Sequence, residues 1–116
     1  MRILDLESIP GTPIQDYQSS GAASATIGHG SGEAHMHWVR FEAKGRIGPH
    51  PTGFAQLLVP IEGEGWAAGP DGQRQELRPG RAAFFSSGEV HSKGSETGMS
   101  AVMIQIGSIT LEMSGP

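Results

Sequence analysis

Two histidines in this chain, His50 and His91, each follow a glycine-containing turn, and each stands on a short segment with strand-like neighbours. Thr52 and Gln56 follow His50 at even spacings, so on a strand these three side chains point to the same side. Two neutral imidazoles from different strands can converge on one ligand or one metal ion, whereas a lone histidine cannot. We therefore predict that the two segments form the two halves of one pocket.

The elements that position these side chains are expected to be strands, because apolar and polar residues alternate and helical periodicity is weak. Residues 34–42 alternate in this way, with His37, Val39 and Phe41 on one face. The other expected strands are 56–61, 64–69, 73–77, 82–86, 100–106 and 108–113, with a hairpin turn at Pro70-Asp71-Gly72. About eight to ten short strands predict an all-β fold, a small β-barrel or jelly roll, because closure removes exposed strand edges.

The composition fits one folded domain and excludes several functions. A chain of 116 residues buries roughly two thirds of its unfolded surface, which is enough for one core. Without cysteine there is no thiolate metal site and no cysteine nucleophile. The net charge of -4, with no lysine or arginine run, argues against nucleic-acid binding. No apolar run reaches the roughly 20 residues of a membrane span, and residues 1–7 do not read as a signal peptide, so a soluble cytoplasmic protein is expected.

The first histidine segment has a spacing that points to a known family. Four residues separate Gly45 from His50, and six separate Gln56 from Gly63. This arrangement resembles the first motif of the cupin superfamily, in which a glycine, His-x-His, an acid or glutamine, and a second glycine follow one another. Thr52 stands in the place of the second histidine and Gln56 in the place of the acid, so the motif is degenerate.

The second histidine segment resembles the second cupin motif, which reads glycine, five residues, Pro-x-Gly, two residues, histidine. Gly80, Gly88 and His91 occupy their places, while Ser86 replaces the proline and Ser95 replaces the terminal asparagine. The resemblance covers roughly residues 34–106. It implies a small single-domain cupin, similar to manganese-dependent hydroxynitrile-lyase-type cupins and to bacterial cupins of unassigned function.

The resemblance implies a divalent metal, Mn, Fe, Ni or Zn, held by His50, Gln56 and His91. Such a metal acts as a Lewis acid on a carbonyl or hydroxyl oxygen of a small organic substrate, which fits lyase, isomerase or dioxygenase chemistry. All three ligands are neutral, so they bind a divalent cation less tightly than a set with a carboxylate would. The expected function is a small-molecule enzyme of this kind.

Further residues are predicted to complete the site. His37 is the candidate proton carrier, because imidazole titrates near neutral pH. Four residues are predicted to contact the substrate: Thr52, Phe54, Trp66 and Gln105. Glu89 is expected to face solvent, and the polar stretch 93–98 is expected to be a hairpin loop at the barrel mouth.

Two alternatives remain open from the sequence. A non-catalytic binding or sensor cupin without metal would keep an apolar barrel with a few convergent polar groups as its ligand pocket. A metal-independent cyclase or epimerase would use the histidines alone. Similarity of fold does not separate these functions, because cupins host many unrelated ones.

Residues 1–33 are predicted to form an N-terminal arm with short strands, and residues 34–116 are predicted to form the barrel. Five apolar residues lie in the first fourteen positions: Ile3, Leu4, Leu6, Ile9 and Ile14. This is more apolar surface than a free arm would carry. We therefore expect the segment to pack on the barrel or cross to a partner subunit, and the protein to be a homodimer.

Overall fold

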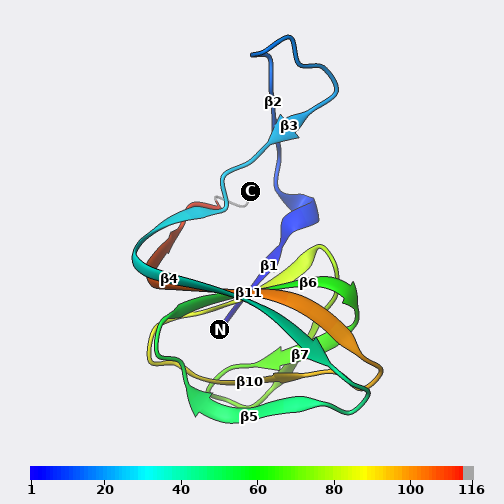
Figure 1. Cartoon of the computed structure of the whole chain (residues 1–116), viewed down its shortest axis with the longest axis vertical. Helices are drawn as coiled ribbons and strands as arrows, with labels where there is room; N and C mark the ends of the chain where they lie inside the picture. The colour runs from blue at the N-terminus through cyan, green and yellow to red at the C-terminus, as the bar shows by residue number, and fades with distance from the viewer. Residues whose placement is uncertain (114–116) are drawn as a thin grey trace.

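The computed structural model describes residues 1–113, which form two antiparallel sheets and a projecting hairpin (Figure 1). The five-stranded sheet has the strand order β1-β9-β6-β11-β4, and the four-stranded sheet has the order β5-β10-β7-β8. The strands of the first sheet are β1 (Arg2–Asp5), β4 (Gly28–Phe41), β6 (Ala55–Gly63), β9 (Arg81–Phe85) and β11 (Met99–Leu111). Those of the second are β5 (Arg46–Pro51), β7 (Gly65–Ala68), β8 (Arg74–Leu77) and β10 (Val90–Gly94). The predicted all-β fold is confirmed.

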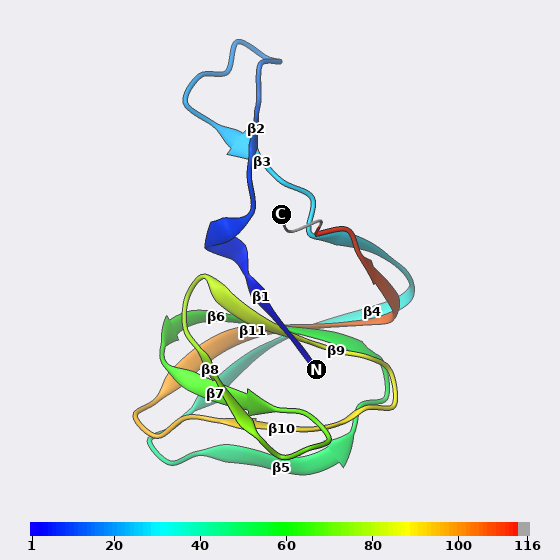
Figure 2. The ribbon, with the colours of Figure 1, turned by 180° about the vertical axis from the view of Figure 1, so that it is seen from behind.

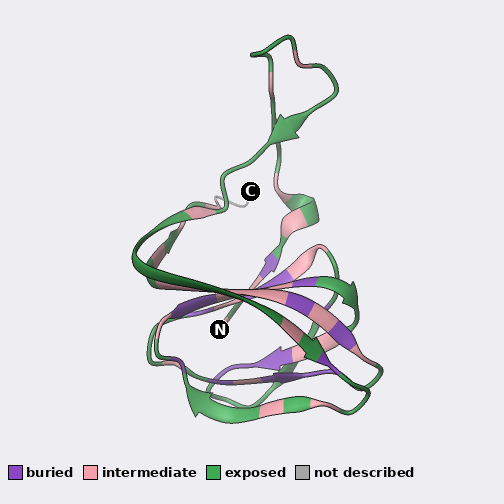
Figure 3. Ribbon diagram, in the orientation of Figure 1, coloured by how far each residue is buried: buried purple, intermediate pink, exposed green. Residues whose placement is uncertain are grey.

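The core lies between the two sheets, and both sheets carry buried residues along their strands (Figure 3). Its buried members are Phe41, Leu58, Ala67, Leu77, Ala83, Phe85, Met99 and Ala101. These residues define the inner face of each sheet, because side chains alternate between the two faces of a strand. The same alternation assigns the residues between them to the outer faces.

The central strand β6 differs from its sequence interpretation. Its apolar run predicts cover on both sides, yet only the inner side is fully covered. Leu58, on the inner face, is completely buried, whereas Ile61 is 51% exposed. The outer face of the five-stranded sheet is therefore apolar without being enclosed by residues 1–113.

The N-terminal segment divides into two parts. β1 pairs with β9 of the same chain, and Leu4 is buried there. After the 3-10 turn η1 (Leu6–Ser8), the chain leaves the barrel and forms the hairpin of β2 (Thr12–Pro13) and β3 (Ala23–Ser24). Figures 1 and 2 both show this hairpin, the arm, projecting away from the sheets. β4 begins at Gly28, six residues before the predicted boundary at residue 34.

The stretch expected to be a loop at the barrel mouth is partly a strand. β10 runs to Gly94, and Lys93 lies opposite Ala67 of the core, so its side chain enters the barrel. In residues 1–113, no helix is long and apolar enough to cross a membrane.

Candidate functional site

The structure brings together the two histidines that the sequence singles out. β5 pairs with β10, and His50 and His91 are direct partners in that pairing. Their Nε2 atoms lie 3.3 Å apart and their ring centroids 4.7 Å apart. His50 is exposed, whereas His91 is 1% exposed. The pair therefore links an imidazole at the surface to one inside the barrel.

Hydrogen bonding assigns the protons of this pair. His50 Nδ1 lies 2.8 Å from the carbonyl oxygen of Gly48, which can only accept, so Nδ1 carries the proton and Nε2 keeps its lone pair. His91 then donates its Nε2–H to that lone pair. A neutral His91 has no proton on Nδ1, and this buried nitrogen has no hydrogen-bond partner within residues 1–113.

The surroundings of His91 keep its ring neutral. Phe85 meets the ring edge-on, with a centroid distance of 4.4 Å. Burial, followed by the charge of Lys93 and by His50, lowers the pKa of His91 from 6.5 to about 3. At neutral pH His91 is thus a neutral hydrogen-bond donor.

A buried lysine, which the sequence motifs do not single out, stands beside the pair. Lys93 is 2% exposed, and its Nζ donates to Gln56 Oε1 and lies 3.7 Å from Met103 Sδ. The ammonium also lies 5.4 Å from the centroid of the Phe85 ring. Burial lowers the pKa of Lys93 from 10.5 to about 8, so the charged form still predominates at neutral pH. Lys93 lies two residues after His91, so on a strand both side chains face the same side, and this spacing could have identified the lysine.

Further polar side chains lie on the inner face of the five-stranded sheet. Gln105 on β11 is opposite both Gln56 on β6 and His35 on β4. Gln105 is half-buried, Gln56 is buried and His35 is exposed, since β4 is an edge strand. The predicted contact residue Gln105 therefore lies in the same row as the buried amide that Lys93 holds.

His37, the predicted proton carrier, lies on the inner face of β4. It alternates with Val39 and Phe41, both of which pack into the core, as the sequence pattern predicts. Its own side chain is exposed, and its ring stacks on His35 with a centroid distance of 6.4 Å. The side chain of His37 therefore faces inward, but it lies at the rim of the barrel and not beside the buried His91.

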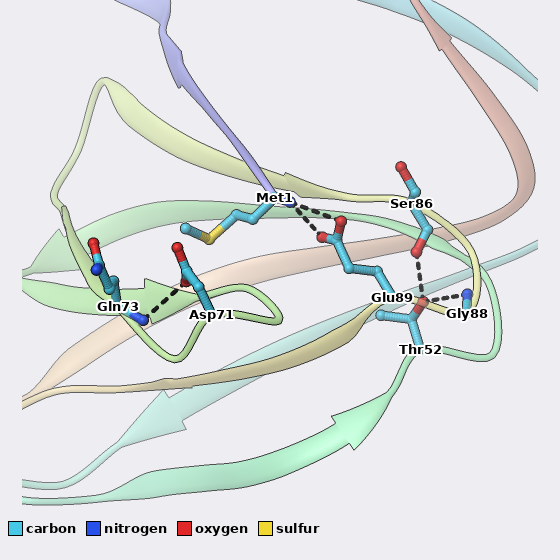
Figure 4. Close-up of polar contacts among 7 residues, drawn as sticks. All are labelled: Met1, Thr52, Asp71, Gln73, Ser86, Gly88 and Glu89. Carbon is cyan, nitrogen blue, oxygen red and sulfur yellow. Dashed lines mark hydrogen bonds and ion pairs between the residues drawn. The ribbon is translucent and has the colours of Figure 1, made fainter.

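Thr52 uses its hydroxyl to hold a turn. Its Oγ1 donates to the carbonyl oxygen of Ser86 at 2.8 Å and accepts from the backbone N–H of Gly88 at 3.0 Å (Figure 4). The threonine is buried, and both capacities of its hydroxyl are in use. In the same view, the carboxylate of Glu89 lies 2.7 Å from the backbone nitrogen of Met1 rather than in solvent.

The two aromatic residues predicted to contact substrate lie in different places. Phe54 is half-buried, and its ring lies 5.6 Å from that of His35, at the rim. Trp66 precedes the core residue Ala67 and so belongs to the outer face of the four-stranded sheet. There the Arg74 guanidinium lies 3.8 Å from the centroid of its ring. The structure does not bring Trp66 to the histidine pair.

The donors around the pair do not fit a divalent metal. Gln56 Oε1 is bonded to an ammonium, and the Thr52 hydroxyl is occupied in its turn. A metal-bound histidine usually donates its second N–H to a protein acceptor, and His91 Nδ1 faces none in the described residues. Across residues 1–113, no three histidine, aspartate or glutamate side chains are grouped to hold a metal ion.

Solved structures identify the class of fold. A cupin superfamily protein from Desulfitobacterium hafniense matches with a TM-score of 0.61 and 13% identity, covering 90% of this chain and 100% of that chain. An RmlC-like cupin with a double-stranded β-helix fold from Methanocaldococcus jannaschii matches with a TM-score of 0.61 and 10% identity, covering 84% and 94%. The chain therefore has the double-stranded β-helix fold of these cupins, the fold that its two histidine motifs imply. The chain matches no protein-family model.

One curated protein is similar in sequence. The (R)-mandelonitrile lyase of Granulicella tundricola is 36% identical over 69 residues, which is 58% of this chain and 53% of that protein. The match thus spans about half the length of the curated relative. It agrees with the resemblance to hydroxynitrile-lyase-type cupins that the motifs indicate.

Proposed function

We propose that this chain binds a small organic molecule at the His50–His91 pair and moves a proton on it, as a lyase or isomerase step requires. The observation that carries the proposal is the 3.3 Å contact between an exposed imidazole and a buried neutral one. A general base must be accessible to the substrate and must be able to take up a proton near neutral pH. An exposed histidine meets both needs.

His50 is the base in this proposal. Its Nδ1–H is fixed on the Gly48 carbonyl, which orients the ring and favours the charge gained when Nε2 takes a proton. His91 cannot take that proton at neutral pH, because burial lowers the pKa of His91 to about 3. Before the step, His91 holds the ring of His50 by donating its Nε2–H to the Nε2 lone pair of His50. This hydrogen bond must break when His50 Nε2 takes the proton from the substrate, and it forms again when the proton leaves.

The similarity to a mandelonitrile lyase supports a hydroxyl-bearing substrate. In cyanohydrin cleavage, His50 would accept the hydroxyl proton while the bond from carbon to the nitrile breaks. The carbonyl forms, and cyanide leaves with the bonding electrons and then takes the proton from His50 as HCN. Every atom and charge in this step is accounted for by the substrate and one histidine.

The metal version of the function, with His50, Gln56 and His91 as ligands, stays a prediction. The lysine bonded to Gln56 weighs against it. Non-catalytic binding also stays open, because the same polar groups inside an apolar barrel suit a ligand pocket.

The test is turnover of racemic mandelonitrile, followed as benzaldehyde formation, with wild-type protein and two matched variants. His50→Ala removes the base, whereas His29→Ala removes an exposed histidine paired with Glu112 at the far end of β4. We expect a loss of at least about 100-fold in His50→Ala, within the usual contribution of a general base. Turnover in His29→Ala should be unchanged.

Other results separate the alternatives. Binding of mandelonitrile without turnover, lost in His50→Ala, would leave a binding module. Turnover that survives in His50→Ala would remove His50 from the chemistry. Activity of wild-type protein abolished by a chelator and restored by added metal would favour the metal version instead.

A further inference from the structure

The described part of the barrel carries its own cation. Lys93 is buried, and its Nζ contacts an amide oxygen, a thioether sulfur and an aromatic ring. None of the carboxylates in residues 1–113 forms an ion pair with it. A buried ammonium without an anionic partner is costly, so such a group marks a place where a ligand can supply the missing charge.

The other polar groups around Lys93 reinforce this reading. His50, His91, Gln56 and Gln105 are neutral or can only become positive. The carboxylate on the inner face of β4, Glu33, is exposed and bonded to His35 at 2.5 Å. Within residues 1–113, the surroundings of Lys93 thus provide hydrogen-bonding groups but no anionic partner.

We propose that Lys93 replaces the divalent metal as the cation of this site, and that the site therefore selects a small organic anion, a carboxylate or an oxyanion. The proposal rests on the proposed function only in sharing its site, and it holds whether or not the bound molecule turns over. In this arrangement the ammonium of Lys93 attracts the anionic group while His50 meets the rest of the ligand from the surface.

Paired probes test the charge requirement. Calorimetric titration with mandelate and with mandelamide compares a carboxylate with its neutral amide on the same skeleton. Wild-type protein should bind mandelate at least about tenfold more tightly, because an ion pair in a partly buried site outweighs a neutral contact. Lys93→Met should abolish that preference, and Lys44→Met, which changes the chain's other lysine at an exposed turn, should keep it.

Metal content tests the replacement. After incubation with Zn or Mn and desalting, elemental analysis should find little metal in wild-type protein. Lys93→Met should retain several-fold more, because Gln56 is then free to join His50 and His91. Near-stoichiometric metal in wild-type protein, or equal binding of the two probes by it, would overturn the proposal. Neither readout requires turnover, so the proposal can fail while His50 remains the base, and the wild-type measurements stand even if Lys93→Met does not fold.

Discussion

The two faces of the five-stranded sheet use the same strands for opposite purposes. On β11, Met103 and Gln105 face inward to Lys93 and Gln56, while Val102 and Ile104 face outward in apolar rows. The inner face combines a closed core with a few buried polar groups, whereas the outer face is apolar and only partly covered. Burial therefore distinguishes the two faces: polar groups inside the barrel form stronger hydrogen bonds, and apolar side chains outside it stay partly exposed.

The contrast is sharpest between two adjacent phenylalanines of β9. Phe85 is fully buried and packs against the His91 ring, whereas Phe84 faces outward and is half-buried. Phe85→Ala should reduce the free energy of unfolding by about 3–5 kcal/mol, since it opens a cavity in the core. Phe84→Ala should cost about 1 kcal/mol. Urea unfolding at equal protein concentrations measures both, and equal losses would contradict the distinction between the faces.

A pH series tests the inner face through His91. Its pKa falls from 6.5 to about 3 in the folded protein, so between these values the unfolded state takes up a proton that the folded state does not. Acid therefore favours unfolding across this range, by at most about 1.4 kcal/mol per pH unit. The titratable groups facing His91 are His50 and Lys93. His91→Gln should show a shallower pH dependence of unfolding than wild type, and parallel curves would contradict the assignment.

Lys93 tests the same inner face at alkaline pH. Its pKa falls from 10.5 to about 8, so the unfolded state holds the extra proton between these values, and wild-type stability should rise as pH increases through them. The rise is at most about 1.4 kcal/mol per pH unit, and Lys93→Met should lack it. Thermal unfolding of both proteins from neutral to alkaline pH measures the difference, with Lys44→Met as the control.

Thr52 lies at the edge of the inner site. Replacing it tests whether its hydroxyl stabilises the fold or contacts the ligand. Thr52→Val removes the two hydrogen bonds that join its turn to residues 86 and 88, so the free energy of unfolding should fall by about 1–3 kcal/mol. Affinity for mandelate should change little, because the hydroxyl is already occupied. A large loss of affinity without a loss of stability would restore Thr52 to the ligand contacts that the sequence predicts.

The smallest effect is expected on the outer face of the isolated subunit. Trp38→Ala should change the free energy of unfolding by no more than about 0.5 kcal/mol in dilute protein, because its side chain is largely exposed. The fluorescence of Trp66 reports unfolding in this variant. A larger effect that grows with protein concentration would instead measure loss of the homodimer that the sequence predicts.

Much of this architecture could be predicted from the sequence. Alternation over residues 34–42 correctly assigns Val39 and Phe41 to the core, and the two glycine–histidine segments become paired strands with His50 opposite His91. The site itself was harder to predict. Lys93 reads as part of a polar loop, and its burial follows from β10 lying opposite the core residue Ala67 of β7.

The sequence by itself determined the all-β class, several strands and turns, and the identities of the two meeting histidines, because these depend on local alternation and on glycine positions. Residues 100–106 and 108–113, predicted as two strands, form the single strand β11. The tertiary structure decided which polar groups are buried and what each one contacts. Trp66 faces outward and contacts Arg74, and the Thr52 hydroxyl stabilises a turn. Lys93 bonds to Gln56, which is 37 residues away in the sequence. Such contacts depend on strand order and register between distant segments, and local residue patterns do not encode these.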